Sequence, residues 1–220
     1  MGTETQETTI QAVAHYAEQT LGSEGFRYVS IVVANCKMLA LQREALNEKQ
    51  NDASDAETVD MDALVIAAYL HDISTASQGF QQHHIASAQM AVDFLQAHQV
   101  APELVQKVEQ AILTHMIANS TEQSSTSSLE GRILYDADKL GRLSGLAVVT
   151  SLIELGARYT NRAVTGDMLV AMLRHIEERF IDLYQSLNTE PARDMAREKF
   201  NSTLAFLDGV IEHLSDATPI

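Results

Sequence analysis

Residues 67–73, Ala-Ala-Tyr-Leu-His-Asp-Ile, close an apolar stretch with two polar groups. The sequence from Ala63 to Leu70 is apolar almost throughout, which predicts a helix that is buried on most sides. His71 and Asp72 therefore stand at the end of a core helix. An imidazole and an aspartate at the edge of a core are costly unless paired, and a divalent cation satisfies both at once. The pair indicates a metal site, although the dipeptide taken alone is more often an ordinary helix end.

The remainder of the chain also favours helix. It has 3 prolines, 10 glycines and no tryptophan, which leaves little material for β turns. We expect an opening helix closed by Leu21-Gly22, a second helix from near Phe26, and further helices over residues 63–70, 85–95, 103–116, 130–149, 151–160, 167–187 and 191–214. The acidic segment 48–60 and the serine-rich segment 119–128 are expected to be exposed loops.

Composition restricts the classes of partner. The formal net charge of −15 and a pI near 4.8 exclude nucleic acid and anionic membranes as expected partners, because such surfaces recruit clusters of Lys and Arg. A small ligand is the better expectation. Cys36 is the single cysteine and reads as a buried, inert thiol, so any metal must be held by histidines and carboxylates. No apolar run reaches about 18 residues and the polar opening lacks the order of a secretory signal, which predicts a cytoplasmic protein.

A second acidic motif is the segment Tyr135-Asp136-Ala137-Asp138-Lys139-Leu140. Apolar residues recur around it at helical spacing, so the core side of the expected helix carries Ile133, Ala137, Leu140, Ser144 and Ala147. Two carboxylates separated by two residues lie about 200° apart on a helix that turns roughly 100° per residue. Only one of them can therefore point into a shared site, and periodicity does not say which. Taken alone, both would be read as solvated surface acids.

The histidines supply further ligand candidates. His83 and His84 precede an expected helix start, and His115 follows an apolar turn. Neutral imidazoles suit zinc, iron and nickel, while carboxylates accept harder ions such as magnesium and manganese. The other histidines have no chemical neighbours in sequence and are expected on the surface; they are His15, His98, His175 and His213.

The order of these motifs resembles that of the HD-domain superfamily of metal-dependent phosphohydrolases. The resemblance covers about residues 10–150 and is carried by AAYLHDI at 67–73, HHIASAQMAVDFL at 83–95, VEQAILTHM at 108–116 and LEGRILYDADKLG at 129–141. It implies an all-α, HD-domain-like helical bundle of about eight to ten helices without a significant sheet. The length of 220 residues, with no internal linker, separately predicts a single domain over residues 1–220. Its HD-like core is expected over about residues 10–150, with the closing helices of residues 151–214 packed on it.

The resemblance implies a metal-ligand set. His71 and Asp72 match metal ligands, and Asp72 is placed to bridge to a second ion or to a bound water. Asp138 matches the last aspartate ligand because Lys-Leu follows it, and Asp136 is the second choice. The implied cofactor is a divalent ion, with manganese, magnesium, iron, zinc, nickel and cobalt all open.

Further roles are implied around these ligands. His83 and His115 match positions that bind a second metal or contact phosphate in some members, and His84 competes with His83 because spacing separates them poorly. Lys139 is a candidate for contact with phosphate, with an ordinary surface role as its alternative. The residues implied in catalysis are Asp72, His83, His115 and Lys139.

One position departs from the family pattern. The first ligand of the family is a histidine on the helix that opens the domain, and Tyr28 takes its place when residues 25–40 are laid on that helix. A phenol is a poor ligand for magnesium or zinc at neutral pH unless the metal deprotonates it. The usual aspartate after Lys-Leu is also replaced, by Gly141.

The expected reaction is hydrolysis of a phosphoester in a nucleotide or another small phosphorylated metabolite, by water whose pKa the metal lowers. His83 or His115 would orient the phosphate or protonate the leaving group, and Lys139 or Arg142 would add positive potential. The first alternative is a regulatory or ligand-binding module that kept the fold and lost turnover through Tyr28. The second is a purely structural helical protein. A homodimer is compatible with the sequence, but no residue set singles out its surface.

Overall fold

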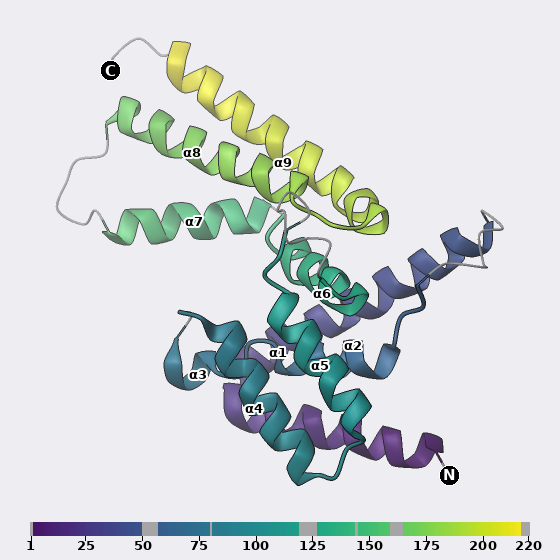
Figure 1. The fold of residues 1–220 in the computed structure, drawn as a ribbon. Coiled ribbons are helices and arrows are strands. Elements are labelled where there is room, and N and C mark those ends of the chain that lie inside the picture. The colour runs from purple at the N-terminus through teal and green to yellow at the C-terminus, as the bar shows by residue number, and fades with distance from the viewer. Residues whose placement is uncertain are drawn as a thin grey trace. The chain divides into compact units, whose positions relative to one another are not determined.

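The computed structural model describes residues 2–49, 57–79, 81–118, 127–143, 145–158 and 165–216. Within these ranges the chain forms nine helices and no strand (Figure 1), so the all-α expectation is confirmed. Most of the expected loops at 48–60 and 119–128 lie outside the described residues. The chain folds into two compact units, Met1–Asp138 with Asn188–Pro191, and Lys139–Leu187 with Ala192–Ile220. The expectation of one domain over the whole chain stays a prediction.

The first unit opens with α1, which runs from Gly2 to Lys49 and is broken at Gly22. Gly22 has φ 71° and ψ 179°, a conformation that only glycine adopts readily, so the expected glycine break is confirmed. The inner face of α1 after the break is the predicted apolar series; its buried members are Val29, Val32, Val33, Cys36, Leu39 and Ala40. This face packs against α2.

The helix α2, Met61–Leu70, is the buried helix that the sequence predicts. Asp60 caps its N-terminus by accepting a hydrogen bond from the backbone N–H of Ala63 at 3.1 Å, and Lys107 Nζ lies 2.7 Å from the same carboxylate. Partial burial by itself raises the pKa of the Asp60 carboxyl. The hydrogen bonds from Lys107 and from the backbone, together with the positive charge of Lys107, outweigh this effect and hold the pKa below its ordinary value. The helix is almost wholly buried and ends at Leu70, so His71 and Asp72 follow it directly.

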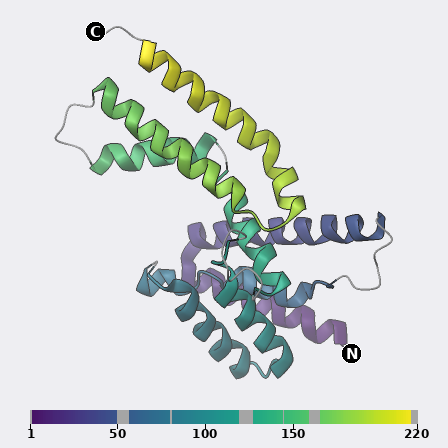
Figure 2. The ribbon, with the colours of Figure 1, turned by 45° about the horizontal axis from the view of Figure 1, so that its top comes forward.

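Three more helices of this unit follow α2 along the chain (Figures 1 and 2). The single turn α3, Thr75–Gln78, was not expected, because four residues are too few to show a helical period. The next two are α4, His83–Ala97, and α5, Pro102–Thr114, which pack against each other, and α5 also packs on α2. The buried apolar residues of α2, α4 and α5 form a hydrophobic core, which includes Leu70, Leu95 and Ile112.

The helix α6, Leu129–Leu140, carries the acidic motif. A Cβ at Gly131 would lie 2.1 Å from Oγ1 of Thr114, so only a glycine fits at this point of α6 against the last residue of α5. The expectation of one helix over 130–149 is wrong: α6 ends at Leu140, and α7 begins at Gly145. Two glycines within five residues, Gly141 and Gly145, lower the helix propensity at this point. Ser144 lies outside the described residues.

The second unit contains α7, Gly145–Arg158, α8, Gly166–Gln185, and α9, Glu190–Asp216. Their shared core is apolar, as expected; its buried residues are Val148, Leu173, Ile176, Leu207 and Ile211. In the described part of the chain no single helix is long and apolar enough to cross a membrane, and only the bent pair of α6 and α7 passes that test jointly.

Candidate metal centre

His71 takes its orientation from the end of α2. It is fully buried, and its Nδ1 lies 2.9 Å from the carbonyl oxygen of Ala68, one of the last carbonyls of that helix. A carbonyl only accepts, so Nδ1 carries the proton and Nε2 carries the lone pair in the neutral ring. Among the described residues Nε2 has no hydrogen-bond partner, although Oδ2 of Asp72 lies 3.4 Å from it. A buried nitrogen of this kind is one that a metal ion would satisfy.

His115 repeats this arrangement at the end of α5. It is the C-terminal capping residue of that helix, it is 1% exposed, and its Nδ1–H donates to the carbonyl oxygen of Ile112. The centroids of the His71 and His115 rings lie 5.2 Å apart. The buried helix α2 and the amphipathic helix α5 thus both end in a buried histidine whose Nδ1 bonds its own backbone, which leaves Nε2 as the ring atom that can bind a metal.

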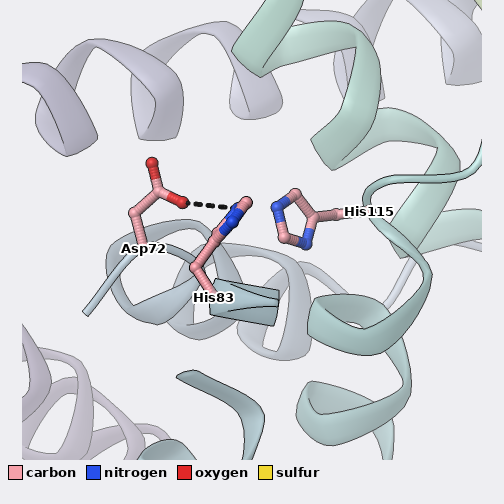
Figure 3. Close-up of side chains that lie close together, drawn as sticks. All are labelled: Asp72, His83 and His115. Atoms are coloured by element: carbon pink, nitrogen blue, oxygen red, sulfur yellow. Dashed lines mark ion pairs between the residues drawn. The ribbon is translucent and has the colours of Figure 1, made fainter. Parts of the chain in front are cut away.

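His83 enters from the first residue of α4. Its Nε2 lies 3.2 Å from Oδ1 of Asp72, and its ring centroid lies 5.6 Å from that of His115. Candidate ligand atoms of Asp72, His83 and His115 all lie within 4.8 Å of one another, with their functional ends turned together (Figure 3). Asp72 therefore presents one carboxylate oxygen toward His71 and the other toward His83.

A buried pair of serines links the turn after Asp72 to the start of α4. The Oγ of Ser87 accepts from the backbone N–H of Ser74 at 3.1 Å and donates to Oγ of Ser74 at 3.0 Å. The Oγ of Ser74 in turn donates to the carbonyl oxygen of His83 at 3.1 Å, and both serines are fully buried. This network fixes Asp72 and His83 relative to each other.

The structure separates the two aspartates of α6, as their angular spacing predicts. Asp138 is 3% exposed, its Oδ1 lies 4.0 Å from Nε2 of His71, and it accepts a hydrogen bond from the hydroxyl of Tyr28. Asp136 instead accepts hydrogen bonds from the backbone and side chain of Asn188 and of Thr189, in the loop between α8 and α9. Burial raises the pKa of the Asp136 carboxyl and these hydrogen bonds lower it. Burial has the larger effect, so the pKa is raised to about 6.

Other candidate residues occupy different environments. His84 is half-buried; burial, and then the neighbouring His83, lower the pKa of its imidazole. Lys139 is 8% exposed, so the surface alternative for it is wrong. Cys36 is fully buried; burial, with the nearby Asp138 and Asp136 carboxylates, raises the pKa of its thiol, which stays protonated as expected. The histidines expected on the surface are exposed, namely His15, His98, His175 and His213.

The donor set fits a divalent ion. Atoms that share an ion at about 2.0–2.2 Å lie roughly 3–4 Å from one another. The distances from His71 Nε2 to Asp72 and Asp138, 3.4 and 4.0 Å, fall in this range, as does the 3.2 Å from Asp72 to His83. Imidazole nitrogens and carboxylate oxygens suit manganese, iron, zinc, nickel and cobalt, and the carboxylates also suit magnesium.

Comparison with known protein families agrees with this arrangement. A family model described as HD domain matches residues 32–143, which is more than half of the chain. The chain belongs to the HD-domain family. The predicted resemblance to the HD-domain superfamily of metal-dependent phosphohydrolases is thus confirmed.

Solved structures share the HD-domain fold over nearly the whole chain. Bacillus subtilis YpgQ in complex with ADP matches with a TM-score of 0.64 at 18% identity, covering 95% of this chain and 96% of its own. An HD-superfamily hydrolase from Bacillus thuringiensis matches at 0.63 and 19%, covering 96% and 100%. A Lactobacillus plantarum protein matches at 0.63 and 21%, covering 99% and 100%. No protein in the curated set matches the sequence.

Some parts of the centre were not identified from the sequence. Ser74 and Ser87 were not singled out, because a serine at a turn or inside a helical pattern carries no local sign of its tertiary partner. The spacing of thirteen residues between the two serines spans a turn and a helix start, and no periodicity relates them.

Proposed function

We propose that this HD-domain protein hydrolyses a phosphoester bond in a nucleotide or another small phosphorylated metabolite, with a divalent ion held by His71, Asp72 and Asp138. The observation that carries the proposal is the buried Nε2 of His71, which lacks a hydrogen-bond partner among the described residues and faces two carboxylates. Leaving such a nitrogen unsatisfied in the protein interior is costly, and a cation between the carboxylates removes that cost.

The geometry at Asp72 supports a bridging role for this residue. Its Oδ2 lies on the side of His71 and its Oδ1 lies on the side of His83, at 3.4 and 3.2 Å. We propose that Asp72 links the ion at His71 to the second cluster of ligand atoms, formed with His83 and His115. That cluster would bind a second ion or a phosphate oxygen.

A bound divalent ion would supply a water of lowered pKa and positive charge against the phosphoryl oxygens. The protein's own groups would position the substrate. His83 keeps 10% of its side chain exposed and His115 is almost wholly buried, so His83 is the better placed to meet a leaving group. Lys139 and Arg142 stay predictions as phosphate contacts.

A nucleotide is the first substrate class to test. Bacillus subtilis YpgQ, which has the same fold at 18% identity, was crystallised in complex with ADP. The acidic composition, with a net charge of −15, makes nucleic-acid polymers poor partners and is compatible with a small ligand neutralised by its metal. We therefore propose a free nucleotide or similar phosphorylated metabolite, and a cytoplasmic setting.

The test is metal content measured by mass spectrometry on purified protein, combined with phosphate release from a nucleotide panel in added manganese. Asp72→Ala removes the proposed shared ligand, and Asp93→Ala is the matched control because Asp93 is exposed on α4. We expect stoichiometric metal and turnover in the wild type and in the control, and loss of both in Asp72→Ala. Metal without turnover would favour the regulatory module, and absence of metal after adding several ions would contradict the proposal.

A further inference from the structure

Two polar side chains of α1 contact the end of α6 beside the metal centre. The hydroxyl of Tyr28 donates to Oδ1 of Asp138, across 110 residues of sequence. Asn35 Nδ2 donates to the carbonyl oxygen of Ala137 at 3.2 Å. Tyr28 and Asn35 are seven residues apart, so they lie two turns from each other on one face of α1. That face therefore binds two consecutive residues of α6, a backbone carbonyl and a side-chain carboxylate.

The contacted segment needs such support. Asp138 lies in the last turn of α6, which ends at Leu140. The last four carbonyls of a helix have no partner within it, so the backbone at this end depends on tertiary contacts for its orientation. A metal ligand must be held within about 0.5 Å of its productive position, which a fraying helix end does not provide.

We propose that Tyr28 and Asn35 form a clamp on α1 that positions Asp138 as a ligand, with Tyr28 acting as a hydrogen-bond donor and not as a ligand itself. This rests on the proposed metal centre. The clamp assigns to the phenol the role that donors around a metal site usually have, which is to orient a ligand by a hydrogen bond. The oxygen that accepts this bond is Oδ1 of Asp138, the one that lies 4.0 Å from Nε2 of His71. Tyr28 is thus a positioning residue. Its ring also lies beside the centre, with its centroid 6.4 Å from that of His71.

The decisive variant is Tyr28→Phe, which removes the hydroxyl and keeps the ring. Loss of an outer-shell hydrogen bond typically weakens metal binding by about 10–100-fold. We expect that loss in manganese affinity, measured by titration calorimetry, while the melting temperature of the chelator-treated protein stays close to that of the wild type. Tyr69→Phe is the matched control, because Tyr69 is a half-buried tyrosine of the same unit that stacks on Phe26; its affinity should not change.

Asn35→Ala is the second variant and keeps the proposal testable if Tyr28→Phe does not fold. It should weaken manganese binding in the same direction and by less, since it frees the Ala137 carbonyl and leaves the Tyr28 contact in place. Unchanged affinity in both variants would overturn the clamp.

A spectroscopic measurement separates the clamp from direct ligation. A phenolate bound to Fe(III) gives a visible charge-transfer band. If Tyr28 is only a donor, the spectra of the ferric-loaded wild type and Tyr28→Phe should be the same, with no such band in either. Such a band would overturn the assignment of Tyr28 as a donor. Asp72→Ala distinguishes the two proposals. If Asp72→Ala binds manganese as tightly as the wild type, the proposed metal centre itself is wrong. If Asp72→Ala loses manganese binding while Tyr28→Phe and Asn35→Ala bind it as tightly as the wild type, only the clamp is wrong.

Discussion

Replacing each aspartate of α6 in turn separates a structural carboxylate from a metal-binding one. Asp136 is fully buried and accepts three short hydrogen bonds, from Asn188 N at 2.7 Å, Thr189 N at 2.8 Å and Thr189 Oγ1 at 2.7 Å. Asp136→Ala leaves the backbone N–H groups of Asn188 and Thr189, two half-buried residues, without this acceptor, and each unsatisfied donor costs up to about 1–3 kcal/mol. Relief of the desolvation of the carboxylate offsets part of that cost. We expect a net loss of about 3 kcal/mol.

A loss of this size is measurable by thermal unfolding. For a chain of this length, about 3 kcal/mol corresponds to a melting temperature lowered by roughly 6–12 °C. The assay is circular dichroism of the metal-free protein in chelator, followed by manganese titration at a temperature where each variant is folded. Asp136→Ala should melt early and still bind manganese. Asp138→Ala should lose manganese binding, since it removes a ligand of the proposed centre.

Asp136→Asn is the control for the size of the residue. It keeps one carbonyl oxygen as an acceptor, so its loss of stability should be smaller than that of Asp136→Ala, with manganese affinity retained. The reasoning would be refuted if Asp136→Ala bound no manganese at a temperature where it is folded while Asp138→Ala bound it normally. That outcome would make Asp136 the ligand, the second choice that the sequence left open.

Three further predictions concern contacts that hold together the helices around the centre or cap them. Ser87→Ala breaks the link between the Asp72 turn and α4, so manganese affinity measured by calorimetry should fall, with unchanged affinity contradicting the role of the link. Gly131→Ala places a Cβ against Thr114, and urea unfolding should show a loss of about 1–3 kcal/mol, whereas a neutral result would show that the helices can separate. Because the folded pKa of Asp60 is lowered, its stabilisation is present above its unfolded pKa and is lost as pH falls through the folded value. Asp60→Asn should therefore lower the free energy of unfolding by less than about 1 kcal/mol at pH 7. Urea unfolding should show that the difference in stability between wild type and variant becomes smaller below about pH 4.

The sequence by itself determined the helices and the order of the chemical motifs. Apolar spacing is a local property, and it correctly predicted α2 as a buried helix that delivers His71 and Asp72 at its end. The 200° argument for α6 is also local, and the structure agrees that Asp136 and Asp138 face different partners. Where the local signal was short or ambiguous, as for α3 and for the break after Leu140, it failed.

The tertiary structure decided which groups meet. Whether Asp136 or Asp138 faces His71 depends on the rotation of α6 against α1 and α2, which no pattern within α6 records. The contact between Tyr28 and Asp138 joins positions 110 residues apart. The sequence placed Tyr28 near the centre only through the family resemblance, and it gave no sign that its hydroxyl would donate to the ligand. The physical reason is that periodicity fixes the face on which a side chain lies, whereas its partner is fixed by the packing of a second element.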